Sequence, residues 1–235
     1  MAGGLHIEMT AFKIIGNLID ESGWTTAIFK AGVASSGVAD SLLKATHVTR
    51  TRHAHQITAD SLSILQHDVN ERYKETLLVG ENVLDFTDWC GKMRAEQPQF
   101  KYWSVVLEME LIIFQIIESI RTGNFLSYRE SLSMFIPWVF SFDHINYASW
   151  LYVSIRDMFS LSETRPVIFK EFVAGRFVAH KTNRPFSAMT LDQAHEQANA
   201  NVKGDGRGRR LDRQPKCTTT LDGCRPRNVK NGGRV

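Results

Sequence analysis

The chain has 235 residues, of which 43% are hydrophobic and 23% charged, and its formal net charge is +3. These values are ordinary for a globular protein, so they exclude a wholly disordered or fibrous chain. Three cysteines are too few for a disulfide framework, and no signal segment of the basic-apolar-small type opens the sequence. We therefore expect an intracellular protein, with the nucleus among the compartments left open.

The charge is divided unevenly along the chain. Residues 204–235 include nine basic and three acidic residues, which gives this segment +6 and leaves residues 1–203 at −3. The same segment has only four large aliphatic side chains, too few to offset the conformational entropy lost on ordering. We predict a helical domain over residues 1–203 and a disordered basic tail over residues 204–235.

Hydrophobic residues recur every three or four positions along most of the domain, as in amphipathic helices. The pattern predicts an all-α assembly with one small β-hairpin near the C-terminal end, formed by residues 176–181 and 186–189. Pro98 is expected to open a helix, and Pro137 is expected to end or kink one. The predicted helices cover residues 5–22, 25–31, 38–45, 48–78, 85–94, 99–121, 125–139, 144–158, 166–172 and 190–202.

The helix over residues 99–121 is the most hydrophobic, and apolar residues cover most of its circumference. Charged and amide side chains interrupt it too often for a membrane span, so we expect it to be the buried centre of the assembly, with Leu111 and Ile113 both inside. Its Glu108 and Glu110 resemble inward carboxylates of a di-metal bundle, but the chain has no Glu-x-x-His, which such a site needs. We expect these carboxylates to pair with basic side chains instead.

Asp192, His195 and Glu196 share one side of the last predicted helix. Two carboxylates and an imidazole with this spacing are candidate ligands for magnesium or manganese. The zinc-protease pattern fails, because residue 199 is Asn instead of a second His. The alternative interpretation is a solvated first helical turn, where acids are favoured by the helix dipole.

A basic segment precedes and opens the long helix over residues 48–78. Lys44, Arg50, Arg52 and His53 are candidate contacts for nucleic-acid phosphates. Basic side chains oppose the dipole at a helix N-terminus, which indicates a partner or a buried acid nearby. The alternative interpretation is a solvated polar face.

Three segments, taken together, carry a resemblance to a known family. They are Gly3-Gly4-Leu5-His6-Ile7-Glu8-Met9, the segment from Asp143-His144 to Trp150, and Asp192-Gln193-Ala194-His195-Glu196-Gln197. Over residues 3–206 the chain resembles the C-terminal part of largely uncharacterised proteins encoded by multicopy, mobile-element-like genes of animals. Since members of that family continue upstream of the first segment, the resemblance implies a missing N-terminal portion.

The arrangement is similar to the late half of a transposase of the ribonuclease-H-like type. On this analogy residues 8–190 correspond to a helical insertion, and Glu196 or Asp192 to the third metal-binding carboxylate. The other two acids would lie before Met1, so the resemblance implies a metal-dependent site, with Mg or Mn, that is inactive in this chain alone.

The tail departs from that family after Gly206. Read one base later, plausible codons for 211–215 and 218–227 permit the sequence with which family members continue, so we interpret the tail as frameshifted. Two function hypotheses follow. The first is a truncated mobile-element-derived protein without catalytic activity. The second is a helical interaction module that binds nucleic acid or a protein partner through the Lys44–His55 face.

Overall fold

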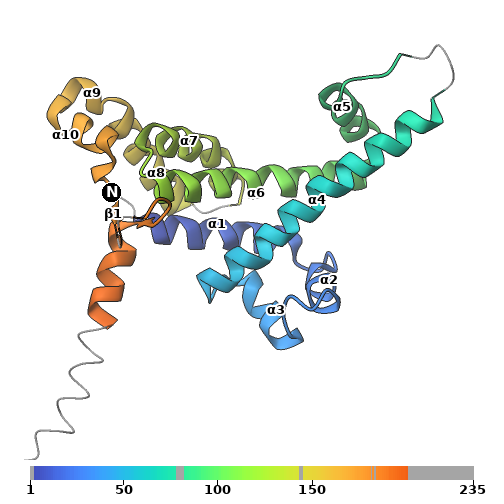
Figure 1. Ribbon diagram of the computed structural model, residues 1–235, viewed down its shortest axis with the longest axis horizontal. Coiled ribbons are helices and arrows are strands. Elements are labelled where there is room, and N and C mark those ends of the chain that lie inside the picture. The colour runs from blue at the N-terminus through green and yellow to red at the C-terminus, as the bar shows by residue number, and fades with distance from the viewer. Residues whose placement is uncertain (1–2, 78–81, 143–144, 181, 183, 201–235) are drawn as a thin grey trace, which may run out of the picture. The chain divides into compact units, whose positions relative to one another are not determined.

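The computed structural model describes residues 3–77, 82–142, 145–180, 182 and 184–200 (Figure 1). Most of these residues are helical, which confirms the predicted all-α class. A further helix covers residues 191–200, and a π-helical turn spans Phe172–Arg176. The other helices are α1 (Gly4–Ile19), α2 (Trp24–Lys30), α3 (Ser36–Leu43), α4 (Val48–Thr76), α5 (Phe86–Glu96), α6 (Pro98–Thr122), α7 (Phe125–Ser141), α8 (Ile145–Phe159), α9 (Leu161–Thr164) and α10 (Pro166–Glu171).

The chain divides after Glu196 into two units, and the packing described below lies within residues 3–196. The predicted tail over residues 204–235 lies outside the described residues, as does the Asp143-His144 pair. The predicted hairpin is confirmed: β1 (Ala179–His180) pairs antiparallel with β2 (Ala188–Met189). No helix among the described residues is long and apolar enough to cross a membrane.

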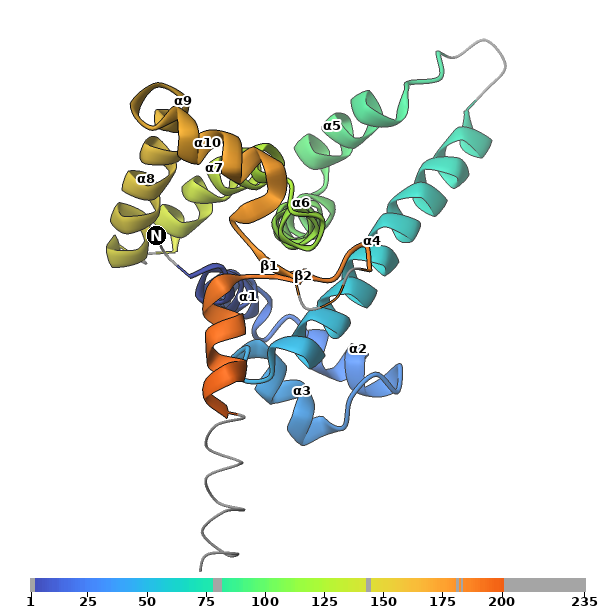
Figure 2. The same cartoon turned by 60° about the vertical axis from the view of Figure 1, so that its left-hand side comes forward.

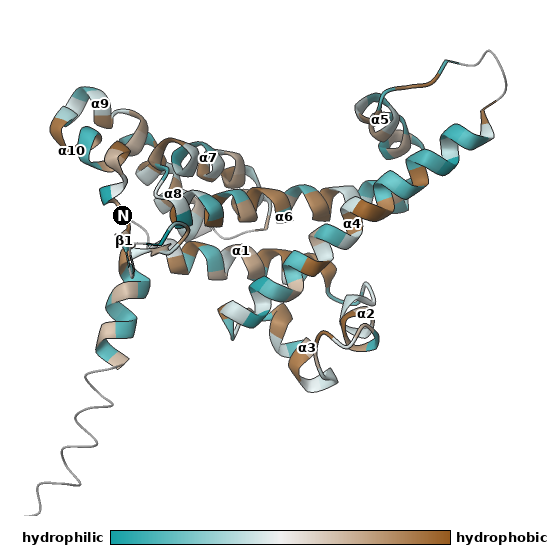
Figure 3. Cartoon of the chain, in the orientation of Figure 1, coloured by the Kyte–Doolittle hydropathy of each residue, from teal (hydrophilic) through white to brown (hydrophobic). Residues whose placement is uncertain are grey.

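Helix α6 is the centre of the core. It packs against α1, α4, α5 and α7, and Figure 2 looks nearly along its axis, with these helices around it. Hydrophobic residues colour α1 and α6 where they lie side by side, whereas α4 is largely hydrophilic (Figure 3). Burying the apolar faces of α1, α6 and α7 against one another supplies the main stabilisation of the fold.

One expectation for α6 was wrong. Ile113 is buried, at 1% exposure, but Leu111 is 56% exposed. Leu111 belongs to a solvent-facing stripe with Glu108, Gln115 and Glu118, at the three- and four-residue spacing that keeps side chains on one face of a helix. Leu111 is therefore exposed because it lies on the polar stripe of α6.

Local signals set several helix ends. Asp85 accepts a 2.8 Å hydrogen bond from the backbone N–H of Asp88 at the start of α5, and Asn124 caps α7 in the same way. Pro98 opens α6 as predicted, and Gly123 ends that helix with a positive φ of 70°. Pro137 does not end α7, which continues to Ser141.

Candidate functional site

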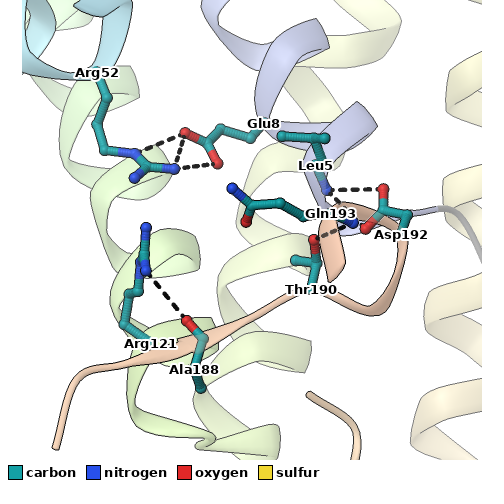
Figure 4. A network of polar contacts seen from close by, with 8 residues as sticks. All are labelled: Leu5, Glu8, Arg52, Arg121, Ala188, Thr190, Asp192 and Gln193. Carbon is teal, nitrogen blue, oxygen red and sulfur yellow. Dashed lines mark hydrogen bonds and ion pairs between the residues drawn. The ribbon is translucent and has the colours of Figure 1, made fainter. Parts of the chain in front are cut away.

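The first and last segments of the resemblance meet at the start of α1. The Asp192 carboxylate accepts hydrogen bonds of 3.1 and 3.4 Å from the backbone N–H of Leu5 (Figure 4). It also lies 3.1 Å from Nδ1 of His6. The N-cap residue of α1, Gly3, has no side chain to cap these donors. Asp192 therefore caps α1 from a distance of 187 residues in sequence.

The two glycines of the first segment are required by this junction. A Cβ atom on Gly3 would overlap the Asp192 carboxylate, and one on Gly4 would overlap the methyl group of Thr190. Only hydrogen atoms fit at these two positions. The Gly-Gly pair thus lets the backbone at the start of α1 approach the segment that begins the helix over residues 191–200.

Hydrogen bonds stabilise the ionised form of Asp192. Burial alone would raise the pKa of its carboxyl group, but hydrogen bonds from Thr190, His6 and the backbone of Leu5 and Gln193 outweigh burial and hold the pKa below the ordinary value. Thr190 also accepts a 3.4 Å hydrogen bond from the backbone N–H of Gln193, so it is the N-cap of the following helix, as its spacing predicts.

One turn further along α1, Glu8 forms a bidentate ion pair with Arg52 of α4. Nε and Nη2 of Arg52 donate hydrogen bonds of 2.8 Å to the two carboxylate oxygens, and Glu8 is only 5% exposed. The basic residues at the start of α4 oppose the helix dipole, which indicated a partner or a buried acid nearby. Glu8 is a buried acid of this kind. Burial raises the pKa of Glu8, although the charges of Arg52 and Arg121 act in the opposite direction.

Arg121, in the last turn of α6, lies close enough for its charge to act on Glu8, although the two side chains form no ion pair. Burial and the charge of Arg52 lower its pKa, while Glu8 raises it. Its Nη1 donates a long hydrogen bond of 3.4 Å to the carbonyl oxygen of Ala188. Sequence analysis missed Arg121, because a basic residue in the last turn of a helix is common and gives no sign of a partner on α1.

The other predicted nucleic-acid contacts lie apart from this cluster. Lys44, Arg50 and His53 are exposed, whereas Arg52 is half-buried. No side chain caps the start of helix α4, so no side-chain acceptor from the N-cap residue offsets the basic charges there. The predicted basic face is therefore split into an exposed part and a part turned toward α1.

His55 occupies the core instead of this face. Its Nδ1 lies 2.6 Å from Oε1 of Glu110, both side chains are fully buried, and the imidazole packs between the rings of Phe12 and Trp24. Burial raises the pKa of Glu110, against the attraction of His55. This pair confirms the expectation that Glu110 binds a basic side chain.

The second glutamate of that helix also has a basic neighbour. Glu108 lies 3.6 Å from Arg94 of α5, at the exposed surface. Both carboxylates of the suspected di-metal motif therefore contact basic side chains, as expected.

The predicted metal ligands do not converge. Asp192 faces Leu5 and His6, while His195 and Glu196 are exposed on the helix over residues 191–200. Within the described ranges, no three His, Cys, Asp or Glu side chains are grouped closely enough to hold a metal ion. The residues present therefore do not assemble a magnesium or manganese site by themselves, and a role for Asp192 or Glu196 beside upstream acids stays a prediction.

Comparison with known proteins assigns a family. The model of a domain of unknown function, DUF8702, matches residues 63–214, which is more than half of the chain. The chain belongs to the DUF8702 family. No curated protein and no solved structure matches it. The matched part begins inside α4, so it includes Arg121 and Asp192 and leaves Glu8 and Arg52 outside.

Proposed function

We propose that this DUF8702 chain is a nucleic-acid-binding helical module of a mobile-element-derived protein, without catalytic activity of its own. The observation that carries the proposal is that Arg52 pairs with the buried Glu8, while Arg121 lies close enough to act on the same carboxylate but is not ion-paired within the described part of the chain. Asp192 also lies close enough to act on Glu8, so the two guanidinium groups and the two carboxylates balance overall, and the Arg121 side of the cluster is the part that favours an anion.

A phosphate group suits this arrangement. Guanidinium groups bind phosphate oxygens through planar, charge-assisted hydrogen bonds. Glu8 holds Arg52 in a fixed orientation, while Arg121 has donors to spare beyond its long bond to Ala188. Figure 4 shows the Gln193 side chain directed toward the space between the two arginines, where its amide would supply a further donor.

Exposed bases at the start of α4 form a second group of positive charges, apart from the cluster. Lys44, Arg50 and His53 add donors of the kind that contact the phosphate backbone irrespective of base sequence. Such contacts position a protein on a duplex and make its affinity dependent on salt. We therefore propose backbone recognition as the mode of binding.

The mobile-element origin is supported by the three segments of the resemblance, of which the first and last form the Asp192 junction. The structural roles of two acidic residues support the proposal that the chain has no catalytic activity of its own. Asp192 caps α1 and Glu8 holds Arg52, so both carboxylates have structural partners within the domain. A metal-dependent strand transfer needs several converging carboxylates.

Fluorescence anisotropy with a labelled DNA duplex tests this proposal on the full chain. Arg121→Gln removes one proposed phosphate contact and Arg50→Ala another, whereas Lys101→Ala removes an exposed base of α6 that has no part in the cluster. The basic tail is the same in all three variants. We expect the first two to weaken binding about three- to tenfold at low salt, and the control to leave it unchanged. Equal affinities for Arg121→Gln and Lys101→Ala would contradict the proposal.

A further inference from the structure

The β-hairpin is anchored at its base and exposed at its turn. Phe177, just before β1, is buried, and the centroid of its ring lies 5.4 Å from that of Tyr128 in the core. Ala188 and Met189 of β2 are buried as well. Phe186, in the turn between the strands, is 58% exposed. The core therefore holds the hairpin in place, while the aromatic ring of the turn lies in solvent.

The backbone at Phe186 has a conformation that bulky residues rarely adopt. Its φ is 61°, in the left-handed region, where Gly and Asn are common and an aromatic residue is an outlier. The next residue braces the turn, because Oγ of Ser187 lies 2.6 Å from the carbonyl oxygen of Arg184 and 2.8 Å from that of Thr182. Strain of this kind clusters at functional sites, which directs attention to this exposed ring.

The surroundings of the ring are basic. No Asp or Glu occurs over residues 172–191, whereas His180, Lys181 and Arg184 come shortly before Phe186 in sequence. Of these, His180 and Arg184 are exposed in the structure. An exposed aromatic ring among positive charges favours a partner with negative charge and flat apolar faces. Nucleic acid is such a partner, because its phosphates are anionic and each of its bases has a π face.

The turn lies close to the proposed phosphate contact. Arg121 donates its 3.4 Å hydrogen bond to the carbonyl oxygen of Ala188, two residues after Phe186 (Figure 4). Two residues of extended chain span at most about 7 Å, which is about the axial rise of two nucleotides in one strand. A strand whose phosphate contacts Arg121 therefore has bases within reach of the ring.

We propose that Phe186 stacks on an unpaired base of a nucleic-acid strand whose phosphate contacts Arg121. This inference rests on the proposed function and adds the form of the substrate. Inside a regular duplex the neighbouring bases cover both faces of each base, whereas a bulged or single-stranded base has a face free for an aromatic side chain. The chain therefore prefers a strand with unpaired bases to a regular duplex.

The preference is for structure and not for sequence. Stacking tolerates any base, because every base has a π face. Contacts to phosphates are equally independent of sequence. Arg121 and Phe186 together thus recognise a distorted or partly unpaired site, whatever its bases.

Two labelled DNA probes of equal length test this inference by fluorescence anisotropy on the full chain. One probe is a regular duplex, and the other carries a single bulged base at its centre. Phe186→Ala removes the ring, and Phe186→Trp keeps an aromatic face. The control, Phe29→Ala, removes a ring of similar exposure, 52%, from α2. Because both phenylalanines are exposed, the variants should fold, which circular dichroism verifies.

We expect the wild type to bind the bulged probe about five- to thirtyfold more tightly than the duplex. Phe186→Ala should lose this preference and keep the affinity for the duplex, whereas Phe186→Trp and Phe29→Ala should retain the preference. Arg121→Gln should weaken binding to both probes, because the phosphate contact is common to them. The same two probes made of RNA show which backbone is bound more tightly, and the preference for the bulge should appear with that one.

The outcomes separate this inference from the proposed function. Equal binding of both probes by the wild type, or a preference that survives Phe186→Ala, would overturn the stacking contact alone, and Arg121→Gln would still report on the phosphate contact. A wild type that binds neither probe would overturn the proposed function and the inference with it.

Discussion

Replacing Arg52 by Met tests whether this residue is held by a buried acid. The variant keeps the length of the side chain but leaves Glu8 unpaired at 5% exposure. Removing one partner of a fully buried ion pair costs about 3–5 kcal/mol, and since Arg52 is 19% exposed we expect about 2–4 kcal/mol in the free energy of unfolding. For a domain of this size that lowers Tm by about 5–15 °C.

Urea unfolding followed by circular dichroism measures this change, with Lys44→Met as the control for loss of an exposed base nearby. The double variant Glu8→Gln with Arg52→Met should recover at least half of the lost stability, because the uncompensated carboxylate is then gone. A loss in Arg52→Met no larger than that in Lys44→Met would refute the ion pair as a structural element.

Three further changes have defined outcomes. Ile113→Ala should lower the free energy of unfolding by about 2–5 kcal/mol, whereas exposed Leu111→Ala should change it by less than about 0.5 kcal/mol in the same urea titration. Glu110 binds its proton more tightly in the folded protein than in the unfolded chain, so the stability of the wild type should fall as pH rises above about 4.5. The stability of Glu110→Gln should fall less over the same range, and a pH series of melting curves measures the difference. Asp192→Ala should cost about 1–2 kcal/mol in thermal unfolding through loss of the α1 cap, and Asp192→Asn less.

Local signals in the sequence were sufficient for most of the fold. Apolar periodicity located the helices, Pro98 marked the start of α6 and Thr190 the start of the last described helix. Leu111 shows where such reasoning fails. Its neighbours in sequence are apolar, but its neighbours on the helix surface are polar, and only the spacing of Glu108 and Gln115 along α6 separates it from the core.

The candidate site was harder to predict, because its contacts join distant parts of the chain. Basic residues at the start of α4 oppose the helix dipole, which indicated a partner or a buried acid nearby. This signal did not identify Glu8 on α1. The contribution of Arg121 had no local signal. Asp192 was expected on a metal-binding or solvated helical turn, and no pattern within one helix could show that it caps another.

The salt dependence of DNA binding tests the central proposal most directly. Each phosphate contact adds about 0.9 to the slope of log affinity against log salt concentration on duplex DNA. The full-length double variant Arg50→Gln with Arg121→Gln should therefore show a slope smaller than that of the wild type by about 1.8, while Lys101→Gln keeps the wild-type slope. An identical slope in the double variant and the wild type would contradict phosphate binding by these two arginines.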